Sequence, residues 1–266
     1  MTEKFSINTE IPNAGRVYDY VLGGSHNFEV DRQAAEYMIS LLPSLPSTRK
    51  WVRMLRMFMH QSIKQLAAEG FEQFLDLASG LPTVDHIHQI LPDAKVVYTD
   101  NDAATIGFAQ ELIGKNDKVR YLQADVRDLE SMLISAEMET FFVKGQRVAI
   151  GFNAMTCFLT HEEIAQLMKT LYAWAPVGSK LYASFETKDA TAMTPKLAQF
   201  VDMFDQMGTP YRFLTLEESQ QLISPWPVDG AGFRPLAEWL DLEDQINLED
   251  REGVELEFYG VHLIKG

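Results

Sequence analysis

Two acidic residues that follow apolar runs are the residues of this chain best placed to do chemistry. Asp76 ends one run and leads into the small-residue turn 78–80, and Asp100 ends a second run about twenty residues beyond that turn. A nucleotide-binding βαβ unit places its ribose acceptor at this spacing. Small residues let the backbone approach a ligand, and a carboxylate can accept hydrogen bonds from two ribose hydroxyls. The pattern therefore predicts a site for a ribose-containing cofactor.

Strand-like and helix-like patterns alternate around these acids from Phe71 onward. The alternation, with no Pro inside the strands, indicates a parallel sheet with helices on both faces. Helices are predicted at residues 83–91, after an Asp102 cap, and after the capping boxes that begin at Thr160 and Thr215. The buried strands are predicted at residues 74–77, 96–99, 119–124, 147–152 and 180–185.

The C-terminal part carries a different pattern. Apolar and acidic residues alternate over residues 254–259, the period of a half-exposed strand that need not be parallel to the others. Before it, a Pro- and Gly-rich stretch at 224–235 is expected to connect toward a possible strand at 236–240.

The N-terminal part, residues 1–70, is predicted to be wholly helical or looped. Helices are expected at 30–42 and 47–69, with Gly70 as the stop of the second. We therefore expect a helical N-terminal part at 1–70 and a sheet domain at 71–266. The second helix has a basic face, interpreted either as a solvated surface or as a positive rim over an anionic substrate or cofactor carboxylate. This face consists of Arg49, Lys50, Arg53, Arg56 and Lys64.

Composition limits the partners and the compartment. The 23 Lys and Arg against 38 Asp and Glu give a formal charge of −15, which opposes binding to nucleic acid. The single cysteine, Cys157, excludes an internal disulfide and fits a reducing compartment. Neither an N-terminal leader nor an apolar stretch of about 18 residues is evident. We expect a cytoplasmic protein with no membrane or nucleic-acid partner, and its oligomeric state stays open.

Two classes of ribose-containing cofactor compete for the predicted site. A dinucleotide requires a Gly-x-Gly-x-x-Gly turn that holds its pyrophosphate at a helix N-terminus, and this fingerprint is absent here. S-adenosylmethionine has no phosphate, and needs a turn near its amino-acid moiety, an acid for its ribose and a polar–apolar pair beside adenine. Asp76, the turn at 78–80, Asp100 and the pair Asp125 and Val126 supply these features at successive strand ends. The sequence favours S-adenosylmethionine, and a nicotinamide-dependent oxidoreductase is the weaker alternative.

Two segments of the chain also resemble a known family. Residues 76–83 together with 97–102 resemble the class I S-adenosylmethionine-dependent methyltransferases. Residues 14–24 read Ala-Gly-Arg-Val-Tyr-Asp-Tyr-Val-Leu-Gly-Gly, followed by Asn27, Phe28, Asp31 and Arg32. This segment is similar to one branch, the actinobacterial-type "S-adenosyl methyltransferase" family, long known as a domain of unknown function. The resemblance extends from about residue 13 to residue 259.

The resemblance implies a fold and a set of cofactor contacts. The fold is α/β: a Rossmann-like, seven-stranded, mostly parallel sheet with helices on both faces, an antiparallel last strand and an N-terminal helical cap over the cofactor. Asp76 with the turn would lie at the methionine moiety, Asp100 at the ribose, Asp125 with Val126 at adenine, and Asn153 near the sulfonium or the substrate. The predicted cofactor residues are Asp76, Ala78, Ser79, Gly80, Asp100, Asn101, Asp125, Val126 and Asn153. No metal site is predicted.

The N-terminal motif supplies candidates for the cap and substrate site. The paired glycines are explained structurally by a tight turn alone, but the turn could also bring Tyr18, His26 and Asn27 over the methyl group. His26 is a conceivable general base, yet no catalytic residue is assigned, because alignment of the reacting atoms alone removes much of the barrier. The candidates are Arg16, Tyr18, Gly23, Gly24, His26 and Asn27.

Two departures from the family pattern affect the functional prediction. Ala78 occupies a position where the family usually has Gly, and Ala restricts the backbone conformations that the turn can adopt. Cys157 lies where relatives often carry His, and we interpret it as a small buried core residue. We therefore predict an S-adenosylmethionine-dependent methyltransferase acting on an unidentified small molecule. The alternative, motivated by the lack of an obvious base, is a protein that binds S-adenosylmethionine or S-adenosylhomocysteine without catalysis.

Overall fold

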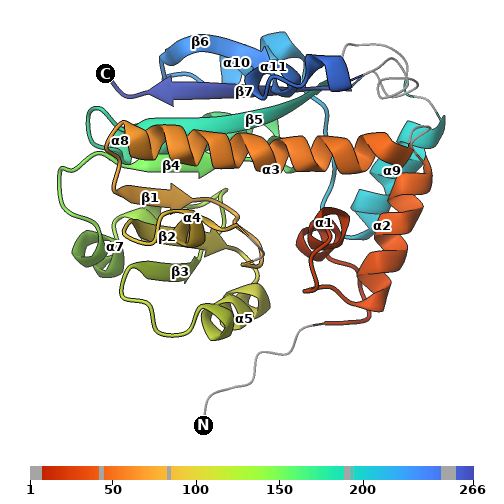
Figure 1. Ribbon diagram of the computed structural model, residues 1–266, viewed down its shortest axis with the longest axis horizontal. Coiled ribbons are helices and arrows are strands. Elements are labelled where there is room, and N and C mark those ends of the chain that lie inside the picture. The colour runs from red at the N-terminus through yellow and green to blue at the C-terminus, as the bar shows by residue number, and fades with distance from the viewer. Residues whose placement is uncertain (1–7, 42–44, 83–84, 189–192, 194, 247–255) are drawn as a thin grey trace.

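Seven strands form one sheet in the order β3-β2-β1-β4-β5-β7-β6 (Figure 1). The computed structural model describes residues 8–41, 45–82, 85–188, 193, 195–246 and 256–266. Strands β1 to β5 are parallel, and β7 pairs antiparallel with both β5 and β6. The predicted Rossmann-like sheet with an antiparallel last strand is thus confirmed. The strands are β1 (Gln73–Asp76), β2 (Lys95–Asp100), β3 (Val119–Gln123), β4 (Ala149–Phe152), β5 (Lys180–Lys188), β6 (Val228–Pro235) and β7 (Leu256–Ile264).

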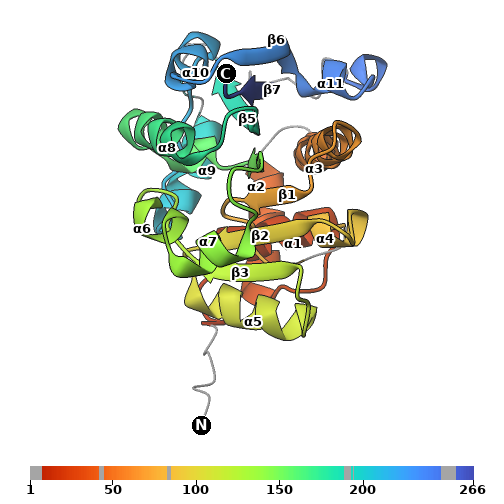
Figure 2. The ribbon, with the colours of Figure 1, turned by 90° about the vertical axis from the view of Figure 1, so that its left-hand side faces the viewer.

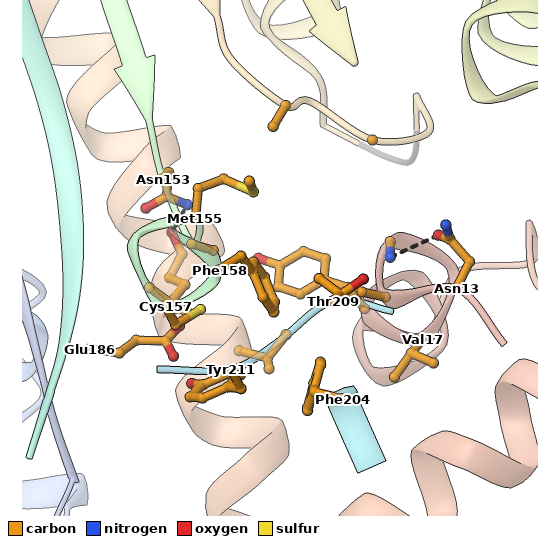
Figure 3. Close-up of a pocket in the computed structure, with 18 of the residues that line it drawn as sticks. Asn13, Val17, Asn153, Met155, Cys157, Phe158, Glu186, Phe204, Thr209 and Tyr211 are labelled. Carbon is orange, nitrogen blue, oxygen red and sulfur yellow. Dashed lines mark hydrogen bonds between the residues drawn. The ribbon is translucent and has the colours of Figure 1, made fainter. Parts of the chain in front are cut away.

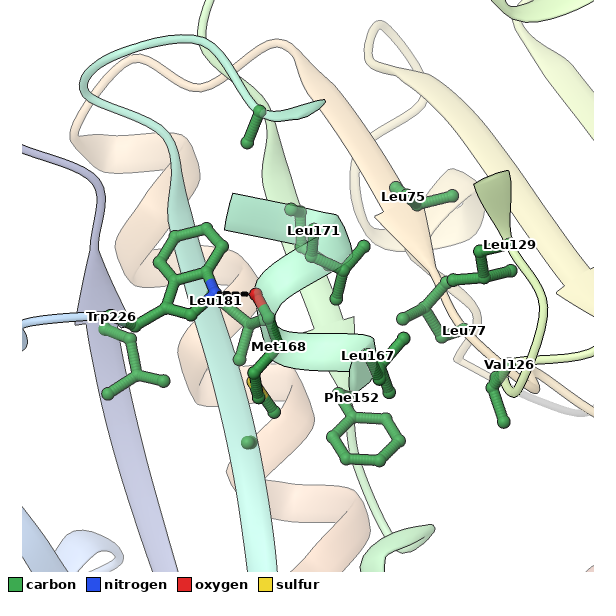
Figure 4. Close-up of a cluster of buried hydrophobic side chains, with 14 of the residues drawn as sticks. Leu75, Leu77, Val126, Leu129, Phe152, Leu167, Met168, Leu171, Leu181 and Trp226 are labelled. Carbon is green, nitrogen blue, oxygen red and sulfur yellow. Dashed lines mark hydrogen bonds between the residues drawn. The ribbon is translucent and has the colours of Figure 1, made fainter. Parts of the chain in front are cut away.

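Helices cover both faces of this sheet (Figure 2). On one face α8 contributes Leu167, Met168 and Leu171 to a core that also holds side chains of β1, β4 and β5 (Figure 4). There Trp226 donates a hydrogen bond from its indole nitrogen to the Met168 carbonyl at 2.9 Å. The helices are α1 (Ala14–Leu22), α2 (Glu29–Leu41), α3 (Leu45–Ala68), α4 (Ile87–Ile90), α5 (Ala103–Ile113), α6 (Glu130–Leu133), α7 (Ala136–Phe141), α8 (His161–Trp174), α9 (Pro195–Gln206), α10 (Leu216–Leu222) and α11 (Leu236–Trp239).

The long helix α3 lies across the opposite face of the sheet. Its Phe58 is fully buried and makes edge-on contacts with Tyr182 of β5 and Trp239 of α11, at 6.4 and 5.3 Å between ring centroids. Gly70 ends the helix as predicted, since it adopts φ +86° and lets Phe71 donate a backbone hydrogen bond to Leu66. Because α3 shares a core with the strands, the predicted domain boundary at residue 70 separates parts that pack together, and it stays a prediction.

A third layer closes the end of the sheet where the parallel strands finish. Helices α1 and α2 pack against α9, which follows them by about 150 residues in the chain (Figure 1). Val17 and Ile39 from the N-terminal helices meet Leu197 and Phe200 of α9 in one buried cluster. The cap is therefore assembled from segments that lie far apart in the sequence.

Two predicted elements are wrong. Residues 236–240 form the helix α11, and the strand precedes them as β6 within the Pro- and Gly-rich stretch. Gly230 and Gly232 adopt positive φ there, in the irregular part of the β6–β7 pairing. The helix expected at 83–91 is only α4, which begins at Ile87 after Asp85 with φ +69°; residues 83 and 84 lie outside the described residues.

The other predicted helix starts agree with the structure. The Asp102 carboxylate accepts hydrogen bonds from the backbone of Ala104 and Thr105. Thr160 and Thr215 each form a capping box, with Glu163 and Glu218 in the third helical position. None of the helices in the described parts of the chain is long and apolar enough to cross a bilayer.

Candidate cofactor and acceptor site

A cavity of about 390 Å³ lies at the carboxyl ends of the parallel strands (Figure 3). Its walls come from the ends of β1 to β5, from α1 and α3, and from α9 with the loop that follows it. Ligands of open α/β sheets bind outside this edge, and small-molecule sites have volumes of about 300–1,000 Å³. All nine predicted cofactor residues line this one cavity.

The turn after β1 is fastened to the end of β2. Ser79 donates from its backbone to the Thr99 carbonyl at 2.7 Å, and the Gly80 amide donates to the Asp100 carboxylate at 3.1 Å. Ala78 and Gly80 both adopt left-handed backbone angles, with φ +50° and +66°. A residue other than Gly is strained in this region, so Ala78 holds the turn in a conformation that Gly would adopt freely.

Asp76 is buried at the end of β1. Burial raises its pKa to about 6, against the opposing effects of a Ser79 hydrogen bond and the Arg56 charge. Gly151 on the neighbouring strand makes room for it. A Cβ at position 151 would lie 2.3 Å from the Tyr182 hydroxyl and 2.6 Å from Asp76 Oδ1. Glycine is therefore required there, since any larger residue would push the carboxylate out of place.

Asp100 and Asp125 differ in their environments. Asp100 accepts backbone hydrogen bonds from Gly80 and Asp102, and burial raises its pKa. Asp125 accepts from the Arg127 Nε at 2.8 Å, and this pairing lowers its pKa. Asp100 is therefore a half-buried acceptor held in a fixed orientation, whereas Asp125 is part of an ion pair nearer solvent.

The N-terminal motif forms the wall opposite the strands, but only one of its six candidates, Tyr18, lines the cavity. Burial raises the pKa of Tyr18 to about 12. Asp19 lines it as well, and its carboxylate accepts from the His26 backbone and the Asn27 side chain at 2.9 and 2.8 Å. The candidates outside the lining are Arg16, Gly23, Gly24, His26 and Asn27.

These five residues fix the shape of the wall. Arg16 is buried in a 2.7 Å ion pair with Asp31. Gly23 ends α1 with φ +87°, and a Cβ on Gly24 would lie 2.1 Å from the Asp19 carboxylate. The motif thus orients α1 so that Tyr18 and Asp19 face the cavity, and a direct role of His26 or Asn27 at the substrate stays a prediction.

The sequence reasoning missed Glu186 and the aromatic residues of and near α9. Glu186 lies near the end of β5, and burial raises its pKa to about 7. Glu186 directly follows the predicted strand at 180–185, as Asp100 follows the predicted strand at 96–99, so the same rule could have identified it. Cys157 lies beside Glu186 and is buried, and burial raises the pKa of its thiol (Figure 3). Arg56 is the residue of the predicted basic face that lines the cavity.

Residues 1–262 match the family model described as S-adenosyl methyltransferase. The chain belongs to this family. The protein is therefore an S-adenosylmethionine-dependent methyltransferase, as predicted, and S-adenosylmethionine is its cofactor. The nicotinamide-dependent alternative gains no support. No curated protein sequence matches the chain significantly.

Solved structures resemble the chain over nearly its whole length. A Thermobifida fusca protein with a provisional methyltransferase assignment is 25% identical, with a TM-score of 0.83 over 97% of each chain. A duf574 family protein from Streptomyces avermitilis is 24% identical, with a TM-score of 0.80 over 98% of this chain and 100% of its own. The fold is shared with geranyl diphosphate C-methyltransferase from Streptomyces coelicolor, solved with Mg²⁺, geranyl diphosphate and S-adenosyl-L-homocysteine. That enzyme is 11% identical, with a TM-score of 0.53 over 99% of this chain and 92% of its own.

Proposed function

We propose that the protein methylates a small-molecule acceptor bound in the same cavity as S-adenosylmethionine. The observation that carries this proposal is the convergence of all nine predicted cofactor residues on one cavity that extends beyond them toward α9. Bound S-adenosylmethionine supplies an electrophilic methyl group on a sulfonium. The walls toward α9 are largely apolar and aromatic, which suits a second, less polar ligand.

The strand ends fit the cofactor chemically. The Asp76 carboxylate is buried and the Asp100 carboxylate is half-buried, and both have raised pKa values. A ligand that brings positive charge and hydroxyl donors would compensate their loss of solvent. We assign Asp76 and the turn at Ala78, Ser79 and Gly80 to the methionine moiety and Asp100 to the ribose. We assign Asn101, Asp125 and Val126 to the adenosine end of the site.

Asn153 is the proposed contact between cofactor and acceptor. Its side-chain amide donates to the Leu55 carbonyl at 3.2 Å, which fixes its orientation. Its Oδ1 is buried and has no hydrogen-bond partner among the described residues, although buried polar atoms are nearly always paired. A ligand near the end of β4 would satisfy it.

A small acceptor is favoured over a macromolecule because the cavity has walls on two opposite sides. Residues of α9 and its following loop, including Phe204 and Thr209, line the cavity opposite the strands. The formal charge of −15 also opposes a nucleic-acid acceptor.

Replacing Asp100 tests the cofactor assignment. Asp100→Ala should weaken S-adenosylhomocysteine binding by about 1–3 kcal/mol, because it removes charge-assisted hydrogen bonds to the ribose. Isothermal titration calorimetry measures this directly, and Asp117→Ala, at an exposed position, serves as the control. Asp100→Asn retains one acceptor oxygen, so its affinity for S-adenosylhomocysteine should fall by less than that of Asp100→Ala. Unchanged affinity in a folded Asp100→Ala protein would contradict the assignment.

A further inference from the structure

Glu186 is a buried acid whose charge the rest of the described protein does not neutralise. Its side chain lies on the same face of β5 as Tyr182, the face that α3 covers, because residues two apart on a strand share a face. The residue is 6% exposed and lines the cavity. Its Oε2 has no hydrogen-bond partner among the residues that the structure describes. Buried carboxylates are normally paired, so this oxygen points to a ligand.

The groups that face Glu186 do not supply a counter-charge. Among the residues that the structure describes, Cys157, from the turn after β4, is the one side chain that hydrogen-bonds Glu186 and affects its pKa. Tyr18 of α1 lies close enough for Glu186, Asp76 and Arg56 all to affect its pKa. Arg56 is the cation in this set, and its charge acts on Asp76 and Tyr18. The Glu186 carboxylate is therefore available to accept a hydrogen bond from the molecule that is methylated.

An aromatic wall stands next to this carboxylate. The Tyr211 ring contacts Phe158 at 5.6 Å, and Phe200 and Phe204 each at 5.0 Å, between centroids. All four residues line the cavity, and Figure 3 shows Phe158 and Tyr211 near Cys157 and Glu186. Aromatic side chains present large apolar surfaces, so this wall suits an apolar acceptor of aromatic size.

We propose that Glu186 is a catalytic base that takes the proton of an uncharged hydroxyl or amine carried on an aromatic-sized apolar acceptor. This inference rests on the proposed function. The acceptor's lone pair forms a bond to the methyl carbon, and the carbon–sulfur bond breaks with its electron pair passing to sulfur. The acceptor's proton passes to the Glu186 carboxylate, which afterwards releases it to solvent. Charge balances, since the sulfonium and the carboxylate are neutralised together.

The same site argues against charged acceptors. A carboxylate or phosphate on the acceptor molecule would lie beside the buried Glu186 carboxylate, and like charges at close range repel each other. An alkylammonium would pair with Glu186 but has no lone pair with which to attack. A neutral hydroxyl or amine can both donate to the carboxylate and act as the nucleophile.

Four naphthalene compounds test this inference. 1-Naphthol, naphthalene, 1-naphthoate and 1-naphthylmethylammonium are titrated by calorimetry into protein saturated with S-adenosylhomocysteine, at pH 6 and pH 8. At pH 8 we expect 1-naphthol to bind at least about tenfold more tightly than naphthalene, as for a hydrogen bond to a charged group, and 1-naphthoate to bind most weakly. The preference for 1-naphthol should fall at pH 6, where Glu186 is protonated.

Glu186→Gln and the exposed Glu111→Gln are the matched variants. In Glu186→Gln the preference for 1-naphthol over naphthalene should drop about tenfold at pH 8 and should no longer depend on pH. The affinity of this variant for S-adenosylhomocysteine should be unchanged. Glu111→Gln should behave as the wild type. A preference for 1-naphthol that is retained in Glu186→Gln, binding of 1-naphthoate tighter than that of naphthalene at pH 8, or no binding of any compound overturns the inference. Failure of the wild type to bind S-adenosylhomocysteine would instead contradict the proposed function.

Discussion

Arg16→Ala should lower the free energy of unfolding by about 3–5 kcal/mol, the range for leaving one partner of a buried ion pair unpaired. Arg16 Nε lies 2.7 Å from Asp31 Oδ2, and the two side chains are 8% and 0% exposed. Asp31 also accepts from the backbone of Asn13 and Phe28, so its carboxylate joins the start of α1 to the start of α2. Without the guanidinium, a buried negative charge has no counter-ion. Urea denaturation at neutral pH measures the loss.

Two further variants identify the cause. Arg16→Ala/Asp31→Asn should be less destabilised than Arg16→Ala alone, because the amide removes the charge and can still accept a hydrogen bond. Lys118→Ala breaks an exposed pair with Asp93, whose side chain is 99% exposed, and should cost no more than about 1 kcal/mol. If Arg16→Ala is as mild as Lys118→Ala, the pair does not anchor the cap.

This anchoring gives most polar residues of the N-terminal motif a structural role. Its polar residues face one another: Arg16 binds Asp31, and Asp19 holds the turn that contains His26 and Asn27. A sequence does not reveal whether a polar side chain points to a ligand or to a neighbouring helix. The structure separates the two cases, since Tyr18 lines the cavity and His26 does not.

The strand-end acids could be predicted because local rules fix their positions. Parallel strands finish at one edge of a sheet, so an acid after each strand must lie near the acid after the next. Asp76, Asp100 and Asp125 follow this rule, and all three line the cavity. The helix caps at Asp102, Thr160 and Thr215 were predictable for a similar reason, since the capping residue and the amides that it binds lie within three positions.

The acceptor end of the cavity could not be predicted in this way. Its aromatic wall forms where α9 meets α1 and α2, and no pattern within α9 indicates which distant segment it will contact. The strand β6 was missed because its glycines read as loop, although Gly230 and Gly232 serve an irregular edge pairing. Glu186 is an exception, because it directly follows the predicted strand at 180–185 and the strand-end rule covers it; in the structure, pairing with β7 extends β5 beyond it to Lys188.

Glu186→Gln should make the protein more stable at alkaline pH while impairing its reaction. Burial raises the folded-state pKa of Glu186 from 4.5 to about 7, so the folded state holds this proton more tightly than the unfolded state. That contribution to stability is fully present below the unfolded pKa and is lost as the pH rises through 7. Between pH 5 and pH 8 the wild type should therefore lose about 2–3 kcal/mol more stability than Glu186→Gln.

Denaturation of the unliganded protein across this pH range measures the difference, and Asp76→Asn provides a comparison. The Asp76 pKa is raised only to about 6, so the stability that depends on its proton is lost at lower pH, mostly before pH 6. If the free energy of unfolding changed with pH in parallel for the wild type and Glu186→Gln, Glu186 would ionise as freely in the folded protein as in the unfolded chain. That result would contradict the prediction. When ionised, Glu186 destabilises the unliganded protein, so stability alone would favour an uncharged residue at this position. A buried acid of this kind is expected where the protein needs a proton acceptor for its reaction.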